Sequence, residues 1–255
     1  MRKQNASRRA ATLLLLPALL LSLCACGPGN GRRIKSGAAA QAPSVAIRHF
    51  DLDAGNENAE LFFEIPVLTE ASSAADRFND FFLSLYGDFA EKELGRVREI
   101  LASAAPGTPS AENPYRDCWT AQVRDCSQRW ISISLSYDWY MGGVLDYGIN
   151  GYAFDRLSGE RLYLNDLLPG SEDRIKSVIA CGLKEKYPEL VEMADFQGNT
   201  PLDALEKLTV PEIDFFIAEG GVITVVFDKY ELAPGAAGML IVPLPGDVAW
   251  ETVRI

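Results

Sequence analysis

Histidine is nearly absent from this sequence. One residue of 255, His49, is a histidine, and neither a cysteine nor a second histidine stands near it. Zinc sites draw mainly on clustered histidine and cysteine, and Ser-His-Asp and Cys-His catalytic groups need a histidine base. We therefore expect neither a metal site nor these catalytic groups. His49 is interpreted as a strand residue at or near the surface.

Motifs for nucleotides and calcium are also missing. Gly142-Gly143 is not followed by the Lys-Ser/Thr of a phosphate loop, and no Gly-x-Ser-x-Gly is present. Residues 51–60 resemble a calcium loop, but Asn56 replaces its required glycine and Phe62 its closing glutamate. We expect no cofactor and no enzymatic activity. A cell-wall sugar hydrolase with paired carboxylates is the alternative, because acidic residues are abundant.

Positive charge is scarce beyond the first 26 residues. The chain has 24 basic and 35 acidic residues, and four of the bases but none of the acids lie in residues 1–26. The rest therefore carries 20 bases against 35 acids, a formal charge near −15. Such a surface repels nucleic acid and anionic lipid and permits a basic partner. Acidity that simply keeps the protein soluble is the alternative interpretation.

Long hydrophobic runs are lacking except for one of 14 residues, Ala10–Leu23, which follows four basic residues. It has the length of a signal-peptide core and is too short to span a bilayer comfortably. Leu23 and Ala25 stand where a bacterial lipobox needs an apolar and a small residue before Cys26. We predict a signal peptide at 1–25, lipid on Cys26 and a location at the outer face of the cell membrane. A plain secretory peptide cut near Ala25 and an uncleaved anchor are the alternatives.

The segment after the lipobox is poor in large apolar residues. Residues 27–44 are rich in Gly, Ala and Ser, so 26–44 is interpreted as the lipidated cysteine and a flexible tether. We divide the remainder into an N-terminal α+β subdomain, 45–145, and a C-terminal one, 146–255. Three further cysteines, Cys118, Cys126 and Cys181, cannot all pair internally. One disulfide with a free thiol, or none, is expected.

Hydrophobic periodicity in the first half predicts two strands, a long helix and a hairpin. The strands are 45–52 and 61–68 and the helix 73–104, with a buried stripe at Phe78, Phe82, Leu85, Phe89, Val97 and Leu101. Ser73 and Asp76 form a capping pattern at its start. The hairpin joins 117–123 to 130–137, where Ile131, Ile133 and Leu135 alternate with Trp130, Ser132, Ser134 and Ser136 on a wetter face.

The second half predicts short strands with helices inserted between them. Strands are expected at 147–154, 160–164, 212–218, 222–228, 239–243 and 250–254. Helical segments are expected at 165–168, at 202–208, and from a cap at Ser171 to about Pro188. The step Glu219-Gly220-Gly221 predicts a hairpin. Locally pairing strands with inserted helices predict an α+β fold with antiparallel sheets and one long helix in the N-terminal half.

Aromatic residues gather around the Gly142-Gly143 step. They are Trp139, Tyr140, Tyr147 and Tyr152. Glycine allows sharp turns and close approach, and Tyr and Trp are favoured in binding surfaces. We predict a ligand-binding loop that uses Trp139, Tyr140, Gly142, Gly143 and Tyr147. A hairpin corner with packed aromatics is the alternative.

This loop belongs to a longer pattern of motifs. Its parts are residues 136–143 (SYDWYMGG), 150–155 (NGYAFD), 158–167 (SGERLYLNDL) and 227–238 (FDKYELAPGAAG), closing on Val242-Pro243. Together these motifs resemble the extracellular domain of RsiV-type anti-sigma factors, which is also found in PdaC-type peptidoglycan deacetylases. The resemblance runs from about Val45 to the C-terminus, and its fourth motif adds Tyr230 to the candidate ligand-binding residues.

The resemblance implies an extracellular two-part α+β module. RsiV senses lysozyme by binding it, and the acidity of this chain would suit that basic partner. The family often continues its Gly-Gly with Ala-His-Gly, whereas Val144-Leu145-Asp146 follows here, so any role of that histidine is absent. No anti-sigma segment or deacetylase domain is recognised. We therefore expect a non-catalytic binding lipoprotein of the cell envelope, with lysozyme or peptidoglycan as its partner. A passive envelope protein is a further alternative.

Overall fold

Six strands form the first of two sheets in the computed structural model, which describes residues 45–103, 109–110, 112–143, 145–195 and 197–245. In spatial order they are β1 (Val45–Asp51), β2 (Ala59–Leu68), β3 (Tyr115–Cys126), β4 (Trp130–Tyr140), β5 (Asp146–Asp155) and β6 (Arg161–Leu162). All neighbouring strands are antiparallel except β2 and β3. That pair is parallel because the long helix carries the chain back along the sheet before β3 begins.

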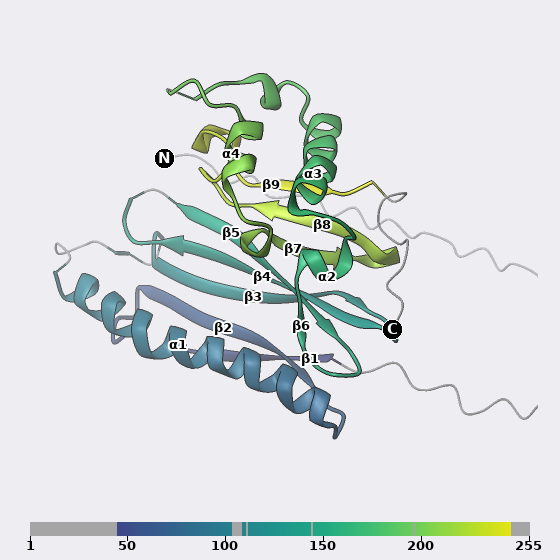
Figure 1. The fold of residues 1–255 in the computed structure, drawn as a ribbon. Coiled ribbons are helices and arrows are strands. Elements are labelled where there is room, and N and C mark those ends of the chain that lie inside the picture. The colour runs from purple at the N-terminus through teal and green to yellow at the C-terminus, as the bar shows by residue number, and fades with distance from the viewer. Residues whose placement is uncertain (1–44, 104–108, 111, 144, 196, 246–255) are drawn as a thin grey trace, which may run out of the picture. The chain divides into compact units, whose positions relative to one another are not determined.

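The helix α1 (Ser73–Ser103) covers one face of this sheet (Figure 1). Its predicted stripe is confirmed: Phe78, Phe82, Phe89 and Val97 are buried, and the first three share a core with β2, β4 and β5. The predicted start at residue 73 is confirmed, but the capping residue is one position earlier than predicted. The Ala75 N–H donates to the Ser72 hydroxyl at 3.1 Å, so Ser72 rather than Ser73 caps the helix.

A second sheet lies on the other face of the first, with helices on its outer side (Figure 1). Its strands are β7 (Asp214–Ala218), β8 (Val222–Phe227) and β9 (Leu240–Pro243), all antiparallel. The helices are α2 (Leu164–Leu167), α3 (Glu172–Lys186) and α4 (Pro201–Lys207), and short 3₁₀ turns lie at Leu190–Glu192, Val210–Glu212, Glu219–Gly221 and Gly235–Ala237. The Ser171 cap is confirmed, since its side chain accepts from the Arg174 N–H. The hairpin at Glu219–Gly221 is confirmed as well. These elements confirm the α+β prediction.

The prediction of a wetter face on β4 is wrong. Ser132 and Ser134 are both fully buried, because β7 crosses the face on which they lie. The Ile217 N–H of β7 donates to the Ser132 hydroxyl, and the Arg124 Nε–H donates to the Ser134 hydroxyl, each at 2.7 Å. The two hydroxyl groups can be buried because each has a hydrogen-bond partner, in the second sheet for Ser132 and in β3 for Ser134.

Other predictions differ from the structure in detail. β6 is two residues long, and Leu164 begins α2 instead of ending a strand. Cys118 and Cys181 are free, so no disulfide joins the three described cysteines to one another. The proposed subdomain boundary at 145/146 falls between β4 and β5, which pair along their length, and the described residues belong to one compact unit.

His49 lies on β1 with a half-exposed side chain, as predicted, and hydrogen bonds to Asp51 and Glu64 raise its pKa. The signal peptide, Cys26, the tether and the predicted strand at 250–254 lie outside the described residues. Within those residues, no helix has the length and hydrophobicity needed to cross a membrane.

Candidate functional site

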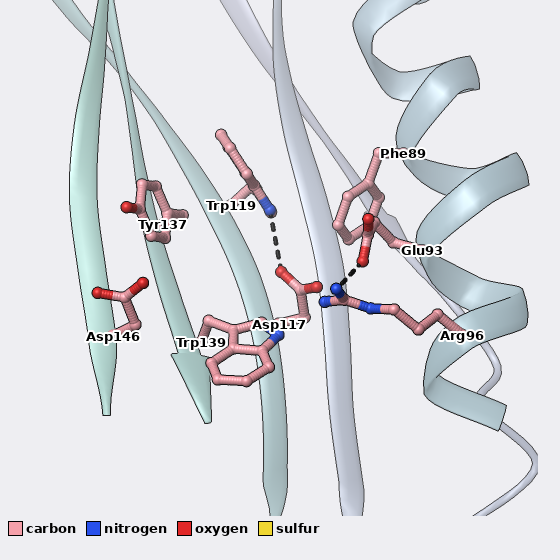
Figure 2. Close-up of a pocket in the computed structure, with 8 residues that line it drawn as sticks. All are labelled: Phe89, Glu93, Arg96, Asp117, Trp119, Tyr137, Trp139 and Asp146. Atoms are coloured by element: carbon pink, nitrogen blue, oxygen red, sulfur yellow. Dashed lines mark hydrogen bonds and ion pairs between the residues drawn. The ribbon is translucent and has the colours of Figure 1, made fainter. Parts of the chain in front are cut away.

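A cavity of about 400 Å³ opens between the C-terminal half of α1 and the ends of β3, β4 and β5. We call it the Trp139 pocket. Its lining residues are Phe89, Glu93 and Arg96 of α1, Asp117 and Trp119 of β3, Tyr137 and Trp139 of β4, and Asp146 of β5. Figure 2 shows the helix residues facing the strand residues across the pocket.

Strand register brings the sheet residues of the pocket together. Asp117 pairs with Trp139 and Trp119 with Tyr137 across β3 and β4, and Asp146 pairs with Trp139 across β5. Because side chains alternate between the two faces of a strand, residues two apart and their cross-strand partners share one face. The pocket wall is therefore a direct result of this register.

The aromatic side of the pocket is built on stacked rings. The Trp119 ring centroid lies 5.1 Å from that of Tyr137 and 5.5 Å from that of Phe63, and the Arg96 guanidinium lies 5.9 Å from the centre of the Trp139 ring. Packed aromatic rings hold their orientation at little entropic cost on binding. They give the pocket a preformed apolar wall.

Asp117 is the buried carboxyl group of the pocket. It is 4% exposed, and the Trp119 Nε1–H donates to its Oδ1 at 3.0 Å (Figure 2). Burial raises its pKa to about 6, and the nearby Glu93 adds to this, whereas the Trp119 hydrogen bond and Arg96 act against it. The Arg96 guanidinium forms an ion pair with Glu93 at 2.9 Å, one helical turn away. Asp117 is therefore a poorly compensated charge at neutral pH.

The indole N–H of Trp139 is the unused donor of the pocket. Its Nε1 is shielded from solvent and has no hydrogen-bond partner among the described residues. A buried donor without an acceptor is uncommon in folded proteins, and at a pocket wall it is available to a ligand oxygen.

A second hollow of about 300 Å³ shares Phe89, Glu93 and Trp119 with the Trp139 pocket. Its remaining residues include Leu85, Asp88 and Lys92 of α1. The two hollows are therefore adjacent along α1.

The structure separates the aromatic residues predicted from the sequence. Trp139 lines the pocket, whereas the Tyr140 hydroxyl accepts from Asn113 Nδ2 at 2.7 Å at the end of β4. Tyr147 is 40% exposed, with its hydroxyl near Gly238. Tyr152 is buried and packs edge-on against Phe82 at 5.6 Å, so it belongs to the core.

The glycines and Tyr230 also lie away from the pocket. Gly142 has a positive φ of 84° with the Tyr115 ring close to its α-carbon, and Gly143 is exposed. Tyr230 is 71% exposed with a positive φ of 73°, rests against Gly235 and lines a separate hollow beside α4.

Sequence reasoning missed most of the pocket. The omitted residues are Phe89, Glu93, Arg96, Asp117, Trp119, Tyr137 and Asp146. A signal was available in the predicted hairpin, because Asp117 and Trp119 on one strand and Tyr137 and Trp139 on the other are each two residues apart. Among the described residues no cluster of three or more His, Cys, Asp or Glu side chains is arranged to hold a metal ion.

Comparison with known proteins gives relatives by structure alone. No family model and no curated protein matches the sequence. A member of the DUF3298 family from Bacteroides fragilis superposes with a TM-score of 0.55 at 15% identity, over 81% of this chain and 92% of that one. A DUF3298 family protein from Pseudomonas aeruginosa has a TM-score of 0.46 at 17% identity, over 80% and 89%. The chain thus shares the fold of a DUF3298 family protein, which fits the resemblance to the RsiV-type extracellular domain at the family level.

Proposed function

We propose that the protein is a lipid-anchored, non-catalytic binding module of the cell envelope, and that the Trp139 pocket binds cell-wall glycan. The observation that carries the proposal is the pocket itself, where packed indole and phenol rings lie beside fixed carboxyl groups. Aromatic faces pack against the C–H faces of sugar rings, and a few polar groups orient the hydroxyls. The adjacent hollow along α1 would accommodate a neighbouring sugar of the same glycan.

Pocket shape favours glycan over lysozyme as the ligand of this site. A stable protein–protein interface buries on the order of 1,600 Å² in total, with about half on each partner, and a small concave pocket does not supply that area. The acidic surface remains the argument for a basic protein partner. Lysozyme binding is therefore an alternative to be separated by experiment.

The carboxyl groups of the pocket favour binding over hydrolysis. A glycosidase needs one carboxyl group free to donate a proton and a second to act as base or nucleophile. Here Glu93 is held in an ion pair with Arg96, and Asp117 accepts from Trp119. Asp146 accepts from the Tyr147 N–H at 3.1 Å. Each carboxyl group thus has a structural contact that fixes it.

Replacing Trp139 with alanine is expected to weaken binding to insoluble peptidoglycan by about tenfold, because truncating an aromatic anchor commonly costs more than 1 kcal/mol. The measurement is co-sedimentation of the purified protein with peptidoglycan over a range of concentrations. Tyr230→Ala is the matched control, since Tyr230 is exposed and outside the pocket, and it should bind like the wild type.

Several outcomes would count against this proposal. They are wild-type protein that does not sediment with peptidoglycan, protein retained on immobilised lysozyme but not on glycan, and soluble reducing sugar released during the incubation. A thermal melt of each variant separates loss of binding from loss of folding.

The leader supports the location outside the cytoplasm, and it gives a second expected result. Wild-type protein and Cys24→Ala should incorporate labelled palmitate and sediment with membranes, because Cys26 has the small residue Ala25 before it. Cys26→Ala should take up no label and leave the membrane fraction. Membrane-bound Cys26→Ala, or wild type without label, would contradict the lipid anchor.

A further inference from the structure

The charges that line the Trp139 pocket do not balance. Three carboxyl groups, on Glu93, Asp117 and Asp146, face one cation, Arg96. Arg96 is engaged with Glu93 at 2.9 Å. Among the described residues no ion pair reaches Asp117 or Asp146. The site therefore carries negative charge without a matching cation.

Burial makes the charge on Asp117 unfavourable in the empty pocket. The residue is 4% exposed and accepts a hydrogen bond from Trp119, which is a neutral donor, and the attraction of Arg96 offsets its burial only in part. A buried charge without an opposite charge is strongly disfavoured, so a cation that reaches the carboxylate recovers part of this free energy. Charge-assisted hydrogen bonds are about twice as strong as neutral ones.

The aromatic walls favour the same kind of ligand. Ring faces attract cations, and the guanidinium of Arg96 already lies 5.9 Å from the centre of the Trp139 ring. The unpaired Trp139 Nε1–H adds a donor for an oxygen atom. One ligand that satisfies all three features has an ammonium group, hydroxyl oxygens and an apolar face on a single ring.

We propose that the Trp139 pocket binds a glycan whose sugar carries a free, protonated amine, with Asp117 taking the ammonium group and Trp119, Tyr137 and Trp139 forming the wall around the ring. An N-acetylated sugar has no charge at this position, so it does not compensate the buried carboxylate. The inference rests on the proposed glycan binding and specifies the class of sugar.

The test compares oligosaccharides of equal length made of glucosamine and of N-acetylglucosamine, titrated by calorimetry into the full-length protein in detergent. Wild-type protein should bind the glucosamine oligomer at least about tenfold more tightly, as expected for one charge-assisted hydrogen bond. Asp117→Asn keeps the acceptor for Trp119 and should lose this preference. Asp80→Asn removes an equal charge from the exposed side of α1 and should keep it.

The wild-type protein supplies a second readout if Asp117→Asn fails to fold. The preference for glucosamine should weaken as pH falls below about 6, because the Asp117 carboxylate takes up a proton there. Equal affinity for the two oligomers would overturn the amine inference and leave glycan binding standing. Binding of neither would overturn both proposals. Equal loss of preference in Asp80→Asn would assign the effect to surface charge and overturn the inference.

Discussion

Replacing Gly151 with alanine is expected to lower the free energy of unfolding by about 3 kcal/mol or more. Gly151 lies in β5, where β7 of the second sheet crosses the first. A β-carbon there would overlap the main-chain carbonyl of Phe215 and lie 2.9 Å from the main-chain nitrogen of Phe216. Main chain in a paired strand cannot move aside as a flexible side chain can, so the two sheets would have to separate.

Gly143→Ala is the matched control for this change. Gly143 is exposed, and a β-carbon at this position would meet no atom within 4 Å. Its unfolding free energy should stay within about 0.5 kcal/mol of the wild type. Urea unfolding of both variants, followed by circular dichroism, makes the comparison. A Gly151→Ala protein as stable as the wild type would show that β5 and β7 do not approach as closely as described.

Stability is expected to fall as pH rises from about 4 to about 7. Burial raises the pKa of Asp117 and Asp214 to about 6 and of Glu231 to about 7. Because these folded-state values exceed the unfolded ones, folding favours the protonated forms. The stabilisation is therefore complete below the unfolded pKa and is lost as pH rises through the folded pKa. A shift of two units corresponds to about 2.7 kcal/mol per group, which we take as an upper value.

Asp214→Asn tests this dependence outside the pocket. The variant should be more stable than the wild type at pH 7.5, by about 1–2 kcal/mol, because it removes a buried charge whose neighbours include Asp228. Its stability should also vary less between pH 4 and 7. Asp80→Asn, on the exposed side of α1, should leave the pH profile unchanged. An Asp214→Asn protein that is less stable at pH 7.5 would show that attraction to Arg161 outweighs burial.

Three other carboxyl groups have the opposite effect on stability, at lower pH. Hydrogen bonds from nearby main-chain and side-chain groups lower the pKa of Asp195, Asp203 and Glu212. Stability supplied by these groups is present above their unfolded pKa and is lost as pH falls through the folded value. The two sets of carboxyl groups together predict maximum stability near pH 4.

Local sequence pattern was sufficient to predict most of the helices and strands. The Phe78–Phe82–Phe89 stripe predicts a helix with one buried face, and that face depends only on helical periodicity. Ser171 predicts the start of α3 because its side chain caps the main chain three residues on. Neither feature requires knowledge of distant residues, which is why both are confirmed.

The candidate site, in contrast, could not be predicted from local sequence pattern. The predicted strand ended at Tyr137 and left Trp139 in a loop, whereas β4 extends to Tyr140. The helix α1 brings Glu93 and Arg96 to this strand from more than 40 residues away in the chain. Sequence reasoning instead grouped Trp139 with Tyr147, which is exposed, and with Tyr152, which packs in the core and lines the second hollow but not the Trp139 pocket. Nearness along the chain was a poor guide because the pocket joins a helix to three strands.

By itself the sequence determined the acidic charge, the α+β class and the faces of individual strands and helices. These properties depend on composition or on the period of a single element. Only the tertiary structure decided which faces are covered. Ser132 and Ser134 have the alternation of a solvent-facing row, yet they are buried because β7 packs across them. The packing of one element on another depends on contacts between residues far apart in the chain, and no local period records it.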